Sequence, residues 1–110
     1  MVVRIEGNSV SISANAKEAE VVTLMPPEEK KYKVLEIALE ATGDGYFSIY
    51  IGTNKICDKI ERNALNIDKR RILVDWELSS STPLKVVFTD ESGSANTARY
   101  LIVFSEEAKG

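Results

Sequence analysis

Apolar and polar residues alternate with a period of two in segment after segment of this chain, and this pattern limits the folds it can adopt. The clearest segment is residues 71–78. Its alternate positions form an apolar face and a mostly polar face, namely Ile72, Val74, Trp76 and Leu78 against Leu73, Asp75 and Glu77. Successive side chains of a strand point to opposite faces, whereas those of a helix turn by about 100° per residue. The alternation therefore predicts β-strands with one face in a core.

The same alternation recurs along the rest of the chain. Residues 46–51 place Phe47, Ile49 and Ile51 inward after a turn that contains two glycines. Residues 84–89 and 97–105, joined by a turn at 90–96, predict a final hairpin, and the unbroken apolar run at 100–104 indicates burial on both faces. Further strands are predicted in residues 2–6, 9–14 and 21–25. Residues 54–70 are predicted to hold a short strand and then a connection across one end of the core.

Residues 28–42 fit two interpretations. They follow Pro26-Pro27, are rich in helix-forming residues and end at Gly43, which are start and stop signals of a helix. However, Leu35, Ile37, Leu39 and Ala41 alternate with Glu36, Ala38 and Glu40, and a helix would turn Ile37 toward its polar side. We favour a strand here, and the sequence alone leaves the helix open.

Seven to eight strands in 110 residues define the expected architecture. One open sheet could not bury this much apolar surface without a covering layer, and the sequence predicts at most one helix that could form that layer. We therefore predict an all-β fold, a two-sheet antiparallel β-sandwich of the jelly-roll or immunoglobulin-like type. Residues 1–110 are expected to form a single domain, because this length suits one core.

Composition removes several classes of function. The chain has no His, which is the commonest general base and transition-metal ligand, and a single Cys, Cys57, which cannot form an internal disulfide. The net charge of −3 argues against nucleic-acid binding. No segment resembles a signal peptide or a membrane span, so we expect a cytoplasmic or assembly-associated protein without a membrane partner.

No catalytic or cofactor-binding motif is present. Nucleophile motifs such as Gly-x-Ser-x-Gly and Ser-x-x-Lys are absent, and the acidic residues alternate as solvent-facing residues do. We expect no enzymatic activity, no cofactor and no resident metal. Calcium stays open, because oxygen-bearing side chains gather in turns, yet turn chemistry explains the same residues. These are Asp44, Asp90, Glu91 and Asn96.

Surplus apolar and aromatic residues are the most informative feature for function. Six of them fall on faces opposite the predicted core, namely Tyr46, Tyr50, Leu73, Val87, Leu101 and Val103. A monomeric sandwich makes that side polar, so these residues suggest either a covering loop or a partner subunit, and symmetric self-association is the commonest way to hide such a surface. These residues are our candidate interface with further copies of the chain or with another protein.

The leading hypothesis is a non-catalytic structural or protein-interaction module. Its predicted outline is similar to the small jelly-roll and immunoglobulin-like sandwiches that build viral particles, tails and cell-surface assemblies, and this resemblance concerns architecture only. The alternative is a small carbohydrate-binding module that uses Tyr46 and Tyr50, with Trp76, as stacking surfaces. Because Trp76 shares its face with apolar residues, we favour a core position for it.

Overall fold

The computed structural model describes residues 2–62 and 72–108, with backbone only for Ile72 and Leu73. Within these ranges the chain forms eight strands. They are β1 (Val2–Ile12), β2 (Ala19–Leu24), β3 (Lys30–Ala41), β4 (Gly45–Ile51), β5 (Asn54–Glu61), β6 (Ile72–Leu78), β7 (Leu84–Asp90) and β8 (Asn96–Ala108).

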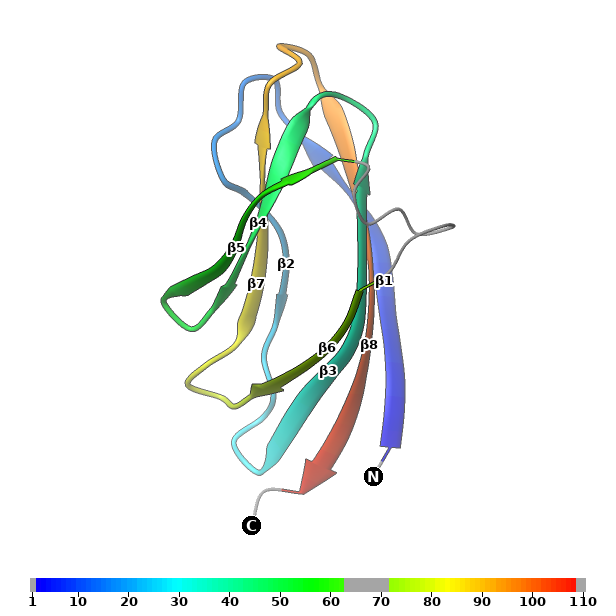
Figure 1. Ribbon diagram of the computed structural model, residues 1–110, viewed down its shortest axis with the longest axis vertical. Helices are drawn as coiled ribbons and strands as arrows, with labels where there is room; N and C mark the ends of the chain where they lie inside the picture. Colours follow the sequence, from blue (N-terminus) through cyan, green and yellow to red (C-terminus); the bar gives the residue numbers. More distant parts are fainter. Residues whose placement is uncertain (1, 63–71, 109–110) are drawn as a thin grey trace.

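The eight strands form two four-stranded sheets that face one another (Figure 1). One sheet has the order β1-β8-β3-β6 and the other the order β2-β7-β4-β5, and the strand pairs in both are antiparallel. Most consecutive strands lie in different sheets, which is the connectivity of a jelly roll. The predicted two-sheet antiparallel sandwich is therefore confirmed, and its type is the jelly roll.

Residues 28–42 form a strand, as favoured above. β3 lies between β8 and β6 and pairs with both. Ile37, Leu39 and Ala41 point into the core, where Ile37 and Leu39 are fully buried. The helix-forming residues of this segment are overridden because a central strand buries one whole face and satisfies its backbone on both sides.

A β-bulge in β3 changes which residues face the core. The register with both neighbouring strands shifts between Val34 and Glu36, and against β8 Leu35 is the extra residue, with no residue opposite it. Val34 is fully buried, whereas Leu35, which was predicted to share the inward face of Ile37, is only partly buried. The extra residue advances the alternation by one position, which is why the simple period fails here.

The core lies between the two sheets. Its largest buried side chains include Phe47 and Phe88, whose ring centroids are 4.8 Å apart. Trp76 packs against this core as a partly buried side chain, as predicted. Cys57 also packs there, and burial raises the pKa of its thiol, in agreement with an inert apolar role.

The first strand is longer than predicted. Residues 2–6 and 9–14 were expected as separate strands, but β1 runs without a register shift from Val2 opposite Glu106 to Ile12 opposite Asn96. Residues 63–70, predicted to include a connection across the core, lie outside the described residues. In the part of the chain that the structure describes, no helix has the length and apolar character needed to cross a bilayer.

Candidate interaction surface

The six predicted interface residues do not form one surface. Tyr46, Tyr50 and Val87 lie in the β2-β7-β4-β5 sheet, whereas Leu73, Leu101 and Val103 lie in the other sheet. Since the two sheets pack face to face, their outer faces point in opposite directions (Figure 1). A single partner cannot contact both groups through one flat interface.

Of the two explanations considered for Val87, a cover within the chain fits the structure and an exposed interface does not. Its side chain is 1% exposed, although it points away from the main core. In the register of the sheet Val87 lies between Glu20 of β2 and Ser48 of β4, and Ser48 is buried as well. On the same sheet, Tyr50 of β4 is hydrogen-bonded to Glu18, which precedes β2, and β7 lies between those two strands.

Those polar side chains form a hydrogen-bonded layer. Tyr50 donates a hydrogen bond of 2.5 Å to Glu18, and Lys55 lies 3.7 Å from Glu18 and 3.6 Å from Asp58. Ser48 donates to Asp58 at 2.8 Å. These bonds raise the pKa of the Tyr50 phenol, mainly through Glu18, and lower the pKa of Asp58, mainly through Ser48. The polar groups of this layer are hydrogen-bonded or ion-paired with one another within the chain.

This layer also bears on the predicted sugar-stacking role. The Lys55 ammonium lies 5.4 Å from the centroid of the Tyr50 ring, and the Tyr50 hydroxyl is engaged by Glu18. Tyr46 is partly buried opposite Thr89 and Glu61, and Trp76 packs against the core. Because Tyr50 and Trp76 are already engaged, these aromatic rings do not form a free planar platform.

The outer face of the β1-β8-β3-β6 sheet is different, because apolar side chains reach its surface. Val3 and Ile5 of β1 are 54% and 69% exposed, and Ile5 lies opposite Val103 of β8. Val103 and Leu101 are partly buried on the same face. We call these four residues the outer strip. The backbone of Leu73 pairs with Glu36 in the same sheet, but its side chain lies outside the described residues.

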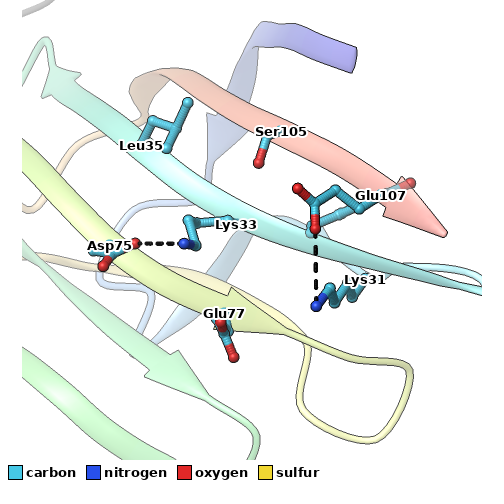
Figure 2. A pocket seen from close by; sticks show the side chains of 8 residues that line it. Lys31, Lys33, Leu35, Asp75, Glu77, Ser105 and Glu107 are labelled. Atoms are coloured by element: carbon cyan, nitrogen blue, oxygen red, sulfur yellow. Dashed lines mark ion pairs between the residues drawn. The ribbon is translucent and has the colours of Figure 1, made fainter. Parts of the chain in front are cut away.

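A groove of about 380 Å³ lies beside the outer strip, over β3 (Figure 2). Leu35 at the bulge and Ser105 supply its neutral part. Charged pairs cross it, with Lys33 3.3 Å from Asp75 and Lys31 3.8 Å from Glu107. An apolar strip bordered by charged pairs of both signs has the anatomy of a protein–protein interface, in which an apolar centre is surrounded by a polar rim.

Sequence reasoning missed three residues of this surface. Val3 and Ile5 were read only as part of a short edge strand, and Leu35 was assigned to the core. The sequence did hold a signal for Val3 and Ile5. In one continuous strand these two residues point to the same side as the other odd-numbered residues, Gly7 and Ser9. Leu35 gave no such signal, because its exposure depends on a bulge that the alternation does not reveal.

The residues considered for calcium mostly have protein partners instead. Asp90 is 6% exposed, and its carboxylate accepts hydrogen bonds from the hydroxyl of Ser92 at 2.6 Å and the backbone N–H of Asn15 at 2.9 Å. Gly93 N and Asn96 Nδ2 also donate to it. These donors, Ser92 first, hold the pKa of Asp90 well below its usual range. Asp44 lies 3.3 Å from Arg62.

Asn96 completes this arrangement as a clamp between two turns. Its Oδ1 accepts hydrogen bonds of 2.8 Å each from Thr42 Oγ1, Gly43 N and Thr97 N. A Cβ atom at Gly43 would lie 2.7 Å from Asn96 Nδ2, so glycine allows this close approach. The oxygens of Asp90 and Asn96 therefore hold the ends of β3, β7 and β8 together, which is a structural role.

Among the described residues, no three His, Cys, Asp or Glu side chains are grouped so that they could hold a metal ion. Some acidic groups there are paired with a cation or bound by a local donor, as Asp75 is by Lys33 and Asp58 by Ser48. This surface offers exposed apolar side chains and charged pairs of both signs.

Comparison with known proteins supports the fold assignment. No protein-family model matches the chain, and no curated protein matches it in sequence. Among solved structures, the capsid asymmetric unit of cyanophage Pam1 matches with a TM-score of 0.58 and 12% identity, over 93% of this chain and 83% of that chain. At this identity the likeness shows a shared fold.

Two further structures match with lower scores. The nucleoplasmin-like N-terminal domain of Drosophila FKBP39 has a TM-score of 0.47 and 10% identity, over 98% of this chain and 93% of that chain. The Tobacco streak virus coat protein dimer has a TM-score of 0.42 and 16% identity, over 98% and 88%.

Proposed function

We propose that this protein is a non-catalytic structural module that works as a subunit in an assembly of its own copies. The observation that carries the proposal is the outer strip, in which Val3 and Ile5 leave more than half of their surface in water. Burying such residues between subunits is favourable by about 25 cal/mol for each Å² of apolar surface removed from water. The jelly-roll fold, which the chain shares with a phage capsid protein, supports the proposal by analogy.

The distribution of charge also supports association between identical copies. Pairs of opposite sign border the outer strip, with Lys33 and Asp75 on one side and Arg99 and Glu40 at one end. A surface that carries both signs can oppose a copy of itself without repulsion, because a rotated copy presents each sign to the other. A face with one dominant sign would repel its own copy.

Sedimentation velocity over a range of concentrations tests the proposal. We expect the protein to sediment as a concentration-dependent mixture of monomer and oligomer, and Ile5→Lys to shift it toward monomer. Ile56→Lys is the matched control, since Ile56 is also exposed, at 40%, but lies on β5 of the other sheet. A monomer at every concentration, or equal effects of the two substitutions, would overturn the proposal.

A further inference from the structure

The free edge of β1 differs from the other sheet edges of the described chain. β1 has one neighbour, β8, and pairs with it over 11 residues without a register shift. The other edge strands carry features that discourage pairing. β2 contains a bulge, β5 has two register shifts and a positive φ at Lys59, and β6 has seven residues. A long and regular edge with unpaired backbone groups is a template for a further strand.

Exposed apolar side chains are concentrated on this edge strand. Among the described residues five large hydrophobic side chains are exposed, and three of them are Val2, Val3 and Ile5. β1 is the edge strand of its sheet and has β8 beside it (Figure 1). The edge with unused backbone groups is thus also the edge with uncovered apolar side chains.

The sequence of β1 is complementary to itself in one antiparallel register. When Ile5 lies opposite Ile5 of a second copy, Arg4 lies opposite Glu6 of that copy, and Glu6 lies opposite its Arg4. Arg4 and Glu6 are both exposed and point to the same side of the strand. The register therefore brings two pairs of opposite charge together about a twofold axis, and directly opposed charges of this kind stabilise an antiparallel pair.

Shape agrees with the same register. Val3 then lies opposite Gly7 of the second copy. Leu101 already occupies the space beside Gly7, where an added Cβ atom would meet Leu101 Cδ1 at 3.1 Å and the backbone oxygen of Tyr100 at 3.0 Å. Because Gly7 has no side chain, Val3 of one copy can pack against Leu101 of the other. The outer strips of both copies then join into one apolar surface.

The neighbouring groups do not oppose the charge pairing. Arg4 lies 3.4 Å from Glu106, yet more than half of its side chain, 55%, is exposed. A guanidinium has five N–H donors, so Arg4 can bind a second carboxylate while it keeps Glu106. Glu6 lies near Tyr100, where burial first and then the Glu6 carboxylate raise the pKa of the phenol.

We propose that two copies associate through antiparallel β1–β1 pairing centred on Ile5, so that two four-stranded sheets become one eight-stranded sheet. The inference rests on the proposed function and specifies its geometry. Pairing along a single strand buries a modest area, so association in the micromolar range is expected for this contact.

Charge-swapped variants test the register. Arg4→Glu places carboxylates at positions 4 and 6, and Glu6→Arg places guanidinium groups at both, so each variant alone opposes like charges. We expect each to self-associate about tenfold or more weakly than the parent protein. An equimolar mixture of the two variants should recover association, because every pair then has opposite signs. Lys85→Glu and Glu28→Arg, both exposed and distant from β1, are the controls that should leave association unchanged.

Cysteine crosslinking provides a second measurement. In a Cys57→Ser background, Ile5→Cys places the two thiols on the twofold axis, and mild oxidation should give a covalent dimer. Ser9→Cys lies on the same strand and face, but in this register its two copies are about 27 Å apart, so it should not crosslink.

The outcomes separate the two proposals. Recovery in the mixture together with crosslinking at position 5 alone supports the β1 register. Oligomers that persist in Arg4→Glu, or that crosslink equally at position 9, would overturn the register and leave the assembly function standing. A parent protein that is monomeric at all concentrations would overturn both.

Discussion

Replacing Asn96 with alanine should clearly destabilise the folded protein, because this one side chain makes four hydrogen bonds between two turns. The substitution removes the three bonds accepted by Oδ1 and the bond of 3.2 Å that Nδ2 donates to Asp90. The Thr97 N–H also donates to the Thr42 hydroxyl at 3.1 Å, so the loss of its bond to Asn96 is compensated. Three uncompensated bonds at about 1 kcal/mol each give a loss of about 3 kcal/mol in the free energy of unfolding.

Urea denaturation followed by the fluorescence of Trp76, the single tryptophan, measures this loss. The midpoint should fall while the slope with urea stays constant, because the surface exposed on unfolding does not change. Asn54→Ala is the control, since Asn54 is exposed, and it should stay within about 0.5 kcal/mol of the parent. Asn96→Asp keeps an acceptor but puts a second carboxylate beside Asp90, so it should also destabilise at neutral pH.

The reasoning fails if Asn96→Ala unfolds within about 1 kcal/mol of the parent protein. That result would mean that water replaces the clamp without cost, and that the ends of β3, β7 and β8 are held by other contacts. Buried hydrogen bonds would then be a poor guide to the stability of this end of the sandwich.

Three more predictions follow from burial and charge. Hydrogen bonds depress the pKa of Asp90 below its ordinary 3.8, so its ionised form stabilises the fold fully above that pH and less as the pH falls further. Asp90→Asn should therefore be less stable than the parent at pH 7 and approach the stability of the parent in acid, as measured by thermal unfolding. Val87→Asn should cost at least about 2 kcal/mol more than Val103→Asn in urea denaturation, since only Val87 is fully buried; equal costs would contradict its shielding. Phe88→Ala should cost about 3 to 5 kcal/mol by the same measurement, because it empties a fully buried site against Phe47, and a loss below about 1 kcal/mol would contradict that packing.

Local alternation was a reliable guide to which segments are strands and to which side most residues point. It placed Phe47 and Ile49 in the core and Trp76 against it, and it favoured the strand over the helix for residues 28–42. The physical reason is that the direction of a side chain relative to its own strand is fixed by the backbone, so one chain segment carries the information.

Alternation was a poor guide wherever one position depends on distant segments. It could not place Leu35, because a bulge shifts the phase of β3 against β6 and β8. It could not show that Val87 is buried, because Glu20 and Ser48, which flank it in the sheet, come from distant parts of the chain. It could not show that Tyr50 and Leu101 lie in different sheets, because the sheet to which a strand belongs is decided by pairing across the whole chain.

The sequence by itself thus determined the two-layered β architecture and the surplus of apolar side chains outside the core. Tertiary structure alone decided where these surplus side chains reach the surface, which is on the edge strand β1 and its neighbour β8. Hydrophobic periodicity is a property of each strand separately, whereas the exposure of an outer face depends on what the rest of the chain lays over it.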